Sequence, residues 1–280
     1  MRSLPFKQVD VFTDIPFRGN PLAVVFEADE LSTAEMQRIA SWTNLSETTF
    51  VCKSRRADYY LRIFSLKCEL PYAGHPTIGS AFAAFEANVV PQNSTSFTQE
   101  CKAGVIPITL ESGVFMSRVP DPKILPIVSD TGRLNNILGI TDLADGTAGV
   151  IDVGPVWMVT RLRDYKQLND LKVNPDALMA LSMETGSVGI NVYAICDDGV
   201  CVRTFAPAVG VPEDPVCGGG NAAVAAHIRA SNLQGQIGST YTARQGSAIG
   251  RDGYVQVCIE KDAIMIGGKA VTVVEGEIHI

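Results

Sequence analysis

The sequence predicts an α+β fold of two similar lobes, each a rolled, mostly antiparallel β-sheet (barrel-like) around a central apolar helix. Three observations favour this class: short segments rich in β-branched and aromatic residues, two helical segments without a polar face, and an internal repeat that contains both helices. The 280 residues are 46% hydrophobic and 19% charged, which suffices for one large core or two medium-sized cores and is too apolar for a disordered chain. We expect the active site in the cleft between the lobes, a favoured place for ligands.

Short runs rich in Val, Ile, Thr, Phe and Tyr predict strands in both halves. Residues 31–42 carry apolar side chains at helical spacing, and Ser32 with Glu35 three positions later forms a capping-box signature. In the first half the expected strands are residues 6–12, 23–26, 48–51 and 59–64. In the second half we expect strands at residues 150–162 and 189–195 and a short helix at residues 175–182.

An internal repeat relates the two halves. Arg-Ile-Phe at 62–64 precedes a loop and a run of small and apolar residues at 73–84, and Arg-Thr-Phe at 203–205 precedes a loop and a similar run at 217–226. A helix without a polar face is expected to be buried on all sides, and here its partner would be a sheet rolled around it. The repeat therefore predicts two lobes; a chance similarity of two Ala/Gly-rich helices is the alternative. Two prolines within residues 118–123 mark the expected boundary.

Both predicted central helices begin at glycine-bearing loops. Pro76 fits the first helical position of the first helix, which places His75 at or near its cap. The second helix opens through Gly218, Gly219 and Gly220, where a backbone can approach a ligand closely. Free N–H groups and the helix dipole make each start a potential anion site, and both could bind one substrate carboxylate. The alternative is that the glycines serve only tight turns.

Three ionisable residues lie near these loops. Glu47 stands at the entry to a predicted strand, His75 at the first helix, and Asp214 in a Pro-Glu-Asp-Pro segment. Taken one at a time they have ordinary explanations: a solvated turn residue, a helix cap or core histidine, and a turn-forming aspartate. These residue types alone leave the function open.

Charge and cysteine usage exclude several classes of protein. The net charge of −7 opposes binding to nucleic acid, while a small anionic ligand remains compatible with local backbone dipoles. The first ten residues lack the basic-then-apolar order of a signal peptide, and no apolar run approaches the ~20 residues of a membrane span. The seven cysteines are scattered without a CxxC pair, which argues against a disulfide framework or a zinc site. We expect a cytoplasmic protein with reduced thiols and no metal.

Several segments together resemble the PhzF-like family of phenazine biosynthesis, which shares its fold with diaminopimelate epimerase and proline racemase. The matching segments begin with Val-Asp-Val-Phe-Thr at 9–13, Gly-Asn-Pro-Leu-Ala-Val at 19–24 and Asn-Leu-Ser-Glu-Thr-Thr-Phe-Val at 44–51. They continue with Glu-Leu-Pro-Tyr-Ala-Gly-His-Pro-Thr at 69–77, Glu-Asp-Pro at 213–215 and Arg-Gln-Gly at 244–246. Each is weak alone, but the ordered set covers almost the whole chain.

The resemblance implies an isomerase that needs no cofactor. It implies that Glu47 is the general acid/base and that His75 and Asp214 bind and polarise the substrate. The founding activity of the family is isomerisation of trans-2,3-dihydro-3-hydroxyanthranilate, in which a proton moves between two carbons of one small ring. The expected partner is a small anionic metabolite, and the expected assembly is a homodimer. The residues expected to bind substrate are Asn20, Ser46, Gly74, Cys217, Gly218 and Gly219. The family fold also implies a first lobe of residues 1–118 completed by 269–280, and a second lobe of 119–268.

The sequence departs from the family pattern after the Glu-Asp-Pro segment. The usual Ala-Thr-Gly-Ser-Ala is replaced by Val-Cys-Gly-Gly-Gly-Asn at 216–221, which removes a hydroxyl at Gly219, and the usual Gly-Arg-Pro-Ser is Gly-Arg-Asp-Gly at 250–253. Epimerases of this fold carry a cysteine at the start of each central helix, and these positions are Ala73 and Cys217 here. One hypothesis is an acid/base pair of Glu47 and Cys217 that epimerises a stereocentre; the alternative is that Cys217 is an apolar filler. A non-catalytic binding scaffold is the competing class.

Overall fold

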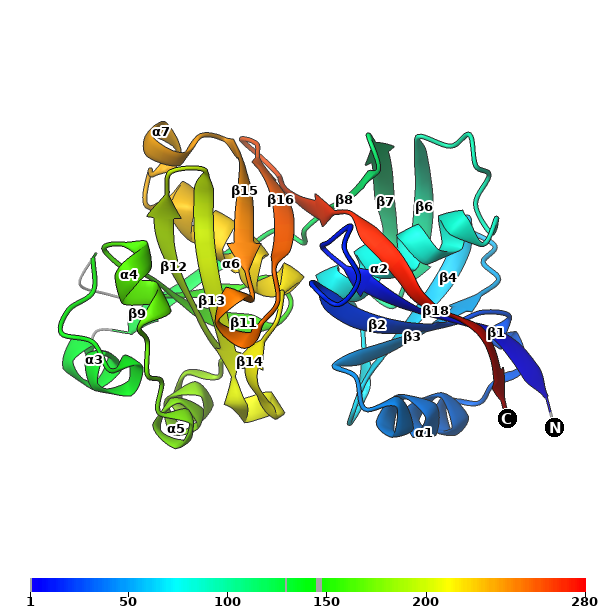
Figure 1. The fold of residues 1–280 in the computed structure, drawn as a ribbon, viewed down its shortest axis with the longest axis horizontal. Coiled ribbons are helices and arrows are strands. Elements are labelled where there is room, and N and C mark those ends of the chain that lie inside the picture. Colours follow the sequence, from blue (N-terminus) through cyan, green and yellow to red (C-terminus); the bar gives the residue numbers. More distant parts are fainter. Residues whose placement is uncertain (1, 129, 145–147) are drawn as a thin grey trace. The chain divides into compact units, whose positions relative to one another are not determined.

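The computed structural model describes residues 2–128, 130–144 and 148–280, and it combines helices and strands as the sequence predicts (Figure 1). The chain forms two compact units. The first unit comprises Met1–Arg118 and Gly267–Ile280, and the second comprises Val119–Ile266. The C-terminal segment thus belongs with the N-terminal residues. Within the described part of the chain, none of the helices has the length and apolar character needed to cross a membrane.

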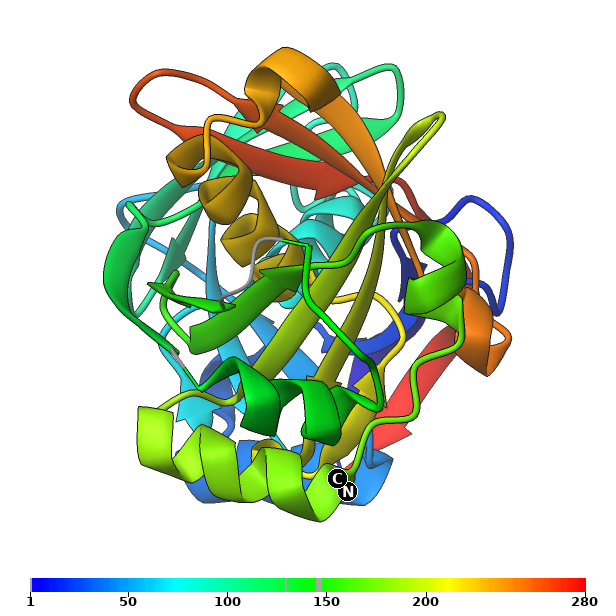
Figure 2. The same cartoon turned by 90° about the vertical axis from the view of Figure 1, so that its left-hand side faces the viewer.

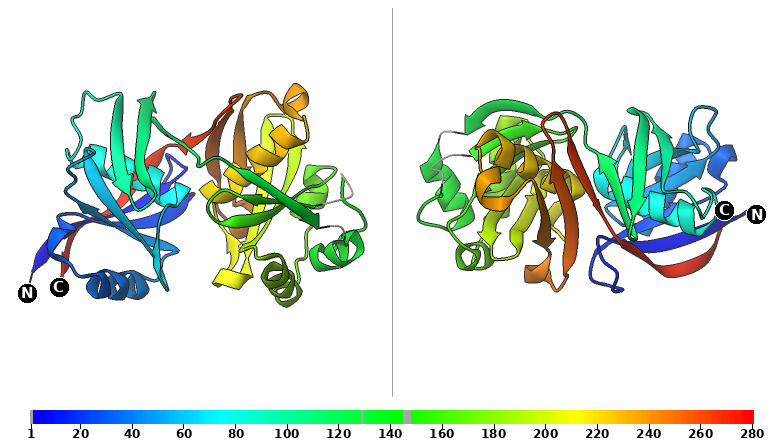
Figure 3. Two further views of the ribbon diagram at one scale, coloured as in Figure 1. Left: turned by 180° about the vertical axis from the view of Figure 1, so that it is seen from behind. Right: turned by 90° about the horizontal axis from the view of Figure 1, so that it is seen from above.

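The strands of the first unit form a closed succession of pairings. β18 pairs with β1, β1 with β2, β2 with β3 (in parallel), β3 with β4, β4 with β6 (in parallel), β6 with β7 and β7 with β8. β8 pairs with β17, which continues into β18 and so returns to β1. Figure 3 shows β18 running beside β1. The strands are β1 (Ser3–Val11), β2 (Asn20–Val25), β3 (Glu47–Cys52), β4 (Tyr59–Ser65), β5 (Glu69–Leu70), β6 (Ser96–Cys101), β7 (Gly104–Glu111), β8 (Val114–Arg118) and β18 (Ala270–His279). β17 (Ile264–Gly268) begins in the second unit and ends in the first.

The helix α2 (Gly74–Glu86) is mostly buried in the first unit. Ten of its thirteen residues are buried, and it contacts β1, β2, β3, β8 and β18. The contact with β1 and β2 is close because a Cβ atom at Gly79 would lie 2.6 Å from Val11 Cγ2 and 2.7 Å from Leu22 Cδ2. The helix α1 (Thr33–Thr43) instead packs outside on β3 and β4. The capping box predicted for Ser32 and Glu35 is confirmed at its start.

The second unit repeats this order of pairings. β11 and β12 are parallel as β2 and β3 are, and β13 and β15 are parallel as β4 and β6 are. Its buried helix is α6 (Gly218–Ala230), again with ten of thirteen residues buried. Its strands are β9 (Lys123–Val128), β10 (Ala148–Asp152), β11 (Val156–Arg161), β12 (Gly189–Cys196), β13 (Gly199–Ala206), β14 (Val211–Asp214), β15 (Thr240–Gln245) and β16 (Gly253–Ile259).

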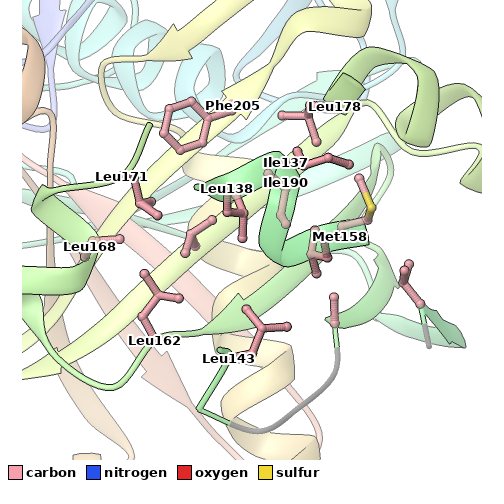
Figure 4. Packing of buried hydrophobic residues seen from close by; sticks show 14 of the residues in the cluster. Ile137, Leu138, Leu143, Met158, Leu162, Leu168, Leu171, Leu178, Ile190 and Phe205 are labelled. Carbon is pink, nitrogen blue, oxygen red and sulfur yellow. The ribbon is translucent and has the colours of Figure 1, made fainter. Parts of the chain in front are cut away.

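Additional helices cover the outer face of the second unit's sheet. In Figure 2, α3 (Thr131–Leu138) and α5 (Pro175–Thr185) lie side by side. Figure 4 shows Ile137, Leu138 and Leu178 of these helices packed on Met158, Ile190 and Phe205 of the sheet. The remaining helices are α4 (Tyr165–Asn169), α7 (Gln234–Ile237) and the 3₁₀ turns η1 (Ala28–Glu30), η2 (Pro207–Val209) and η3 (Ser247–Ile249).

The internal repeat extends to individual contacts. The guanidinium of Arg62 donates hydrogen bonds from Nε to Glu69 Oε1 and from Nη2 to Glu69 Oε2, both at 2.8 Å. Arg203 makes the same fork with Glu213, at 2.9 and 2.8 Å. Each guanidinium also lies over the ring two residues later, Phe64 at 5.2 Å and Phe205 at 5.0 Å. A chance similarity of two helices does not account for matched contacts outside the helices.

Two predictions about local structure are wrong. Residues 150–162 do not form one strand, because a turn at Val153, where its N–H donates to Pro155 O at 3.1 Å, separates β10 from β11. The turn needs Gly154, whose φ is 106°. Pro76 is the third residue of α2 rather than the first, and the N-cap is Ala73. His75 therefore lies within the first turn of the helix.

Candidate functional site

Glu47 is the first residue of β3, as predicted for the entry to a strand. The chain arrives there from the end of α1 through Asn44, which adopts the left-handed conformation with φ 57° and ψ 30°. Across the sheet Glu47 pairs with Ser65 of β4. Its side chain is 20% exposed, so a ligand can reach the carboxyl group although most of its surface is covered. Ser46 precedes it directly and makes no side-chain hydrogen bond with the described residues.

His75 connects Glu47 to the start of β2. Its Nδ1 lies 3.1 Å from Glu47 Oε2, and its Nε2 lies 3.1 Å from the carbonyl oxygen of Asn20. Only 6% of the side chain is exposed. Because a carbonyl oxygen can only accept, Nε2 must carry a hydrogen, and the tautomer is assigned from its partner. Nδ1 then either accepts O–H from a neutral Glu47 or donates N–H to a carboxylate. The contact is therefore compatible with either form of the carboxyl group.

Further contacts hold this pair in place. The N–H of Gly19 donates to Asp10 Oδ2 at 3.0 Å, and Asp10 is buried. This anchors the chain immediately before Asn20, whose carbonyl fixes the imidazole. The ring of Phe12 lies 6.4 Å from that of His75, tilted by 41°. Apolar packing on one side and a backbone acceptor on another leave the imidazole a single orientation, directed at the carboxyl group.

The start of α2 leaves backbone donors beside His75. The N-cap Ala73 has no side chain that could accept, and Pro76 has no N–H. The first N–H of the helix with an internal acceptor is that of Thr77, which donates to Ala73 O at 3.1 Å. For the N–H groups of Gly74 and His75 the described residues provide no acceptor, as is usual in a first turn. These two N–H groups belong to His75 itself and to the residue before it, and together they can bind an anion.

The second unit holds the other predicted site residues at the turn from β14 into α6. Asp214 ends β14, and its Oδ1 accepts the N–H of Val216 at 3.1 Å. Cys217 is the N-cap of α6, with Sγ accepting the N–H of Gly220 at 3.2 Å. Gly218 and Gly219 are the first two residues of the helix. The structure thus brings Asp214, Cys217 and both glycines together within one turn.

Gln245 was missed as a member of this group. It is buried, its Oε1 accepts from Cys217 N–H at 3.2 Å and from Asn221 Nδ2 at 2.9 Å, and its Nε2 donates to the main-chain oxygen of Asp214 at 2.9 Å. Gln245 therefore connects both sides of the turn. The Arg-Gln-Gly segment was available as a signal, because it is one of the segments that carry the resemblance.

The repeat places different chemistry at equivalent positions. Phe50 pairs with Arg62, and Val192 pairs with Arg203, so Phe50 and Val192 are equivalent positions of the repeat. Glu47 and Gly189 each lie three residues earlier and are therefore equivalent as well. A Cβ atom at Gly189 would lie 2.0 Å from Phe205 O, so the second unit has no space for a side chain there. Conversely, Ala73 and Cys217 both cap a central helix. At these positions the first unit carries a carboxyl group and an imidazole, and the second carries a thiol.

A cavity of about 540 Å³ in the first unit lies apart from these residues. Its lining includes Lys7, Glu86, Asn88 and Glu275. Because Glu86 ends α2 while His75 lies in its first turn, the cavity is at the opposite end of that helix. Size alone would therefore direct attention away from Glu47.

Comparisons with known proteins agree with the motifs. A family model described as "Phenazine biosynthesis-like protein" matches residues 9–276. Antisense-enhancing sequence 1 of Schizosaccharomyces pombe is 38% identical, with 98% of each chain covered. Trans-2,3-dihydro-3-hydroxyanthranilate isomerase of Pseudomonas chlororaphis is 35% identical, with 87% of this chain and 86% of the relative covered. The crystal structure of a PhzF-family protein of Bacillus anthracis matches with a TM-score of 0.89 and 26% identity over 100% of both chains.

Proposed function

The chain is an isomerase of the phenazine biosynthesis-like family, and we propose that it moves a proton between two carbons of a small carboxylate-bearing metabolite, with Glu47 as general acid/base. The contact that carries this proposal is Glu47 Oε2 to His75 Nδ1 at 3.1 Å, with the imidazole held by the Asn20 carbonyl. A related protein takes trans-2,3-dihydro-3-hydroxyanthranilate according to its name, and a similar cyclic carboxylate is the proposed class of substrate here.

In the proposed reaction Glu47 acts first as base and then as acid. The carboxylate takes a proton from a C–H bond, and the electron pair of that bond spreads into an adjacent double bond or carbonyl group. The resulting carboxylic acid is kept in position by Nδ1 of His75, which lies 3.1 Å from Glu47 Oε2. It then returns the proton to a different carbon, so that the product is an isomer and the enzyme is unchanged. The N–H groups of Gly74 and His75 stabilise the negative charge that develops on the substrate.

An epimerase is the second candidate, because Cys217 caps α6 with its sulfur at the N–H of Gly220, 3.2 Å away. A thiol at a helix start can be acidic enough for proton transfer. In this variant Glu47 and Cys217 act on one stereocentre, and the product is a stereoisomer. The roles of Asp214 and Asn20 in substrate binding, the small anionic metabolite and the homodimer remain predictions from the resemblance.

Proton NMR in heavy water tests the proposal. The protein and its Glu47→Gln variant are incubated with a panel of small carboxylates that includes dihydrohydroxyanthranilate and common amino acids. We expect wild-type protein to exchange a carbon-bound proton or to yield an isomer, and the variant to do neither. A shifted double bond identifies an isomerase, and a stereoisomer identifies the epimerase. Equal exchange by both proteins would refute the role of Glu47, and ligands that bind without any exchange would favour a scaffold.

A further inference from the structure

The second unit contains a buried donor that lacks an acceptor. Trp157 lies on β11 and is 5% exposed. Its indole Nε1 is covered, yet among the described residues it has no hydrogen-bond partner. Buried polar groups are nearly always paired, and an unpaired one lowers the stability of the fold. A ligand that accepts a hydrogen bond from the indole N–H would account for the unpaired donor.

The indole nitrogen faces the first turn of α6. A Cβ atom at Gly219 would lie 3.6 Å from Trp157 Nε1 and 3.6 Å from Pro155 Cγ. These are ordinary van der Waals distances, so an atom fits in front of the indole where Gly219 lacks a side chain. The next glycine is different, because a Cβ atom at Gly220 would lie 2.1 Å from Asn191 Oδ1. Gly219 is also partly exposed, which gives a ligand a way in.

Two backbone N–H groups stand at the start of α6 next to this space. The N–H of Gly220 donates to Cys217 Sγ at 3.2 Å, and that of Asn221 donates to Cys217 O at 2.9 Å. For the preceding N–H groups of Gly218 and Gly219 the described part of the chain offers no acceptor. The thirteen-residue helix adds its positive end at this point. With the indole of Trp157, three N–H groups at the start of α6 lack an acceptor among the described residues, which suits a ligand that only accepts hydrogen bonds.

We propose that Trp157 is a substrate-binding residue, whose indole N–H and the N–H groups of Gly218 and Gly219 together bind a carboxylate of the ligand. A carboxylate matches because it accepts several hydrogen bonds and carries a negative charge toward the helix start. The inference rests on the proposed function in one respect, since the carboxylate belongs to the class of substrate proposed there. It adds a residue that selects acids over the corresponding amides and esters.

The test uses the two tryptophans of the chain as reporters. The ¹⁵N-labelled protein gives one indole signal from Trp157 and one from Trp42, which is 82% exposed in the first unit. The protein is titrated with sodium benzoate and, separately, with benzamide. We expect benzoate to shift the Trp157 signal saturably, benzamide to shift it much less, and Trp42 to stay unchanged. A Trp157 signal that does not move with benzoate would overturn the proposal.

Two variants separate binding from folding. Trp157→Phe removes the N–H and retains an aromatic ring, while Gly219→Ala fills the space and favours the helix. Both are expected to weaken benzoate binding about tenfold or more, as for a lost charge-assisted hydrogen bond; binding by Trp157→Phe is followed by the backbone amide signals of Gly218 and Gly219. Gly219→Ala is expected to keep its melting temperature, and Trp42→Phe is the matched control with unchanged binding. Wild-type affinity in Gly219→Ala would contradict the proposal.

The outcome is independent of turnover. Benzoate binding is measured without a reaction, so Glu47→Gln is expected to show the same Trp157 shift while losing proton exchange. A protein that exchanges protons but shows no shift would refute the carboxylate site alone. A protein that shows the shift but exchanges no proton with any carboxylate would refute the proposed reaction alone.

Discussion

Nδ1 of His75 faces the carboxyl group of Glu47, 3.1 Å from Oε2, and can donate to it or accept from it while Nε2 is held by the carbonyl oxygen of Asn20. The carboxyl group can therefore be neutral or ionised without leaving its position. A group that both removes and returns a proton needs this property, since the same atom must be base and acid within one turnover.

Replacement of Glu47 by glutamine is expected to lower the rate by about 10²- to 10⁴-fold, the usual contribution of a positioned acid/base. The amide preserves the size of the side chain but cannot take up a proton, so the melting temperature is expected to stay close to that of the wild type. The rate of proton exchange with the best substrate of the panel is the measurement. Glu111→Gln, at an exposed position of β7, is the control and should be as active as wild type.

His75 is expected to act by positioning Glu47. In His75→Asn the side-chain amide can donate to the carboxylate of Glu47 but cannot take up its proton. In His75→Gln the amide is expected to keep the contact with the Asn20 carbonyl oxygen and to lose the contact with Glu47. We expect both variants to lower kcat with little change in KM, because the imidazole holds the carboxyl group and not the substrate. A raised KM with wild-type kcat would contradict this positioning role.

Cys217→Ser distinguishes the two candidate reactions. Serine caps helices well, and its hydroxyl can accept the N–H of Gly220 that Sγ accepts now. We expect Cys217→Ser to exchange protons at the wild-type rate, as an isomerase that uses Glu47 alone would. A loss of about 10²-fold or more would instead place the thiol in the proton transfer. Substrate deuteration followed by NMR measures both.

The Arg62–Glu69 pair is expected to make the first unit sensitive to acid. Burial raises the pKa of Glu69, but hydrogen bonds from Arg62 and Lys102 outweigh it and leave the pKa below its ordinary value of 4.5. A carboxyl group whose pKa is lowered on folding stabilises the protein above its unfolded-state pKa. That stability is lost as the pH falls through the folded-state pKa, so the loss begins below about pH 4.5.

Glu69→Gln tests this expectation. At pH 7 the variant is expected to be less stable by about 1.5–3 kcal/mol, the range for hydrogen bonds to charged groups. Its stability should depend less on pH below 4.5 than that of the wild type. Urea unfolding at several pH values measures both, and parallel pH curves for the two proteins would contradict the expectation. Glu277→Gln, on the exposed part of β18, is the control.

Gly79→Ala is expected to destabilise the first unit although alanine is the better helix former. Its Cβ atom would lie 2.6 Å from Val11 Cγ2 and 2.7 Å from Leu22 Cδ2, so the helix or the sheet must shift. Overpacking of this kind costs about 1–3 kcal/mol. Chemical denaturation measures the loss, and a stability equal to or above that of the wild type would show that the sheet yields easily.

Patterns along the chain predicted the elements better than their contacts. The buried helices α2 and α6 and the capping box at Ser32 follow from local composition. The hydrogen bond from His75 to the Asn20 carbonyl does not, because it joins residues 55 positions apart through a main-chain atom. The turn at Gly154 does not follow from the pattern, because its Gly-Pro pair stands within an otherwise apolar run.

Trp157 and Gly189 show why the rest of the site could not be predicted. Trp157 belongs to no motif, and only its short distance from Gly219 in the structure indicates that its N–H faces the start of α6. Gly189 looks like any glycine at a strand start, and only the register with Phe205 shows that a side chain would clash there. Both depend on pairings between segments far apart in the sequence.

The pairing of β18 with β1 has a consequence for the order in which the nascent chain can fold. Domains usually fold as they leave the ribosome, the N-terminal one first. Here residues 119–266 have all been synthesised before the first unit is complete, because that unit still lacks Gly267–Ile280. Until Ala270–His279 has been synthesised, one edge of β1 stays without its partner and is open to pairing with other chains. The N-terminal half of this protein is therefore the last to mature.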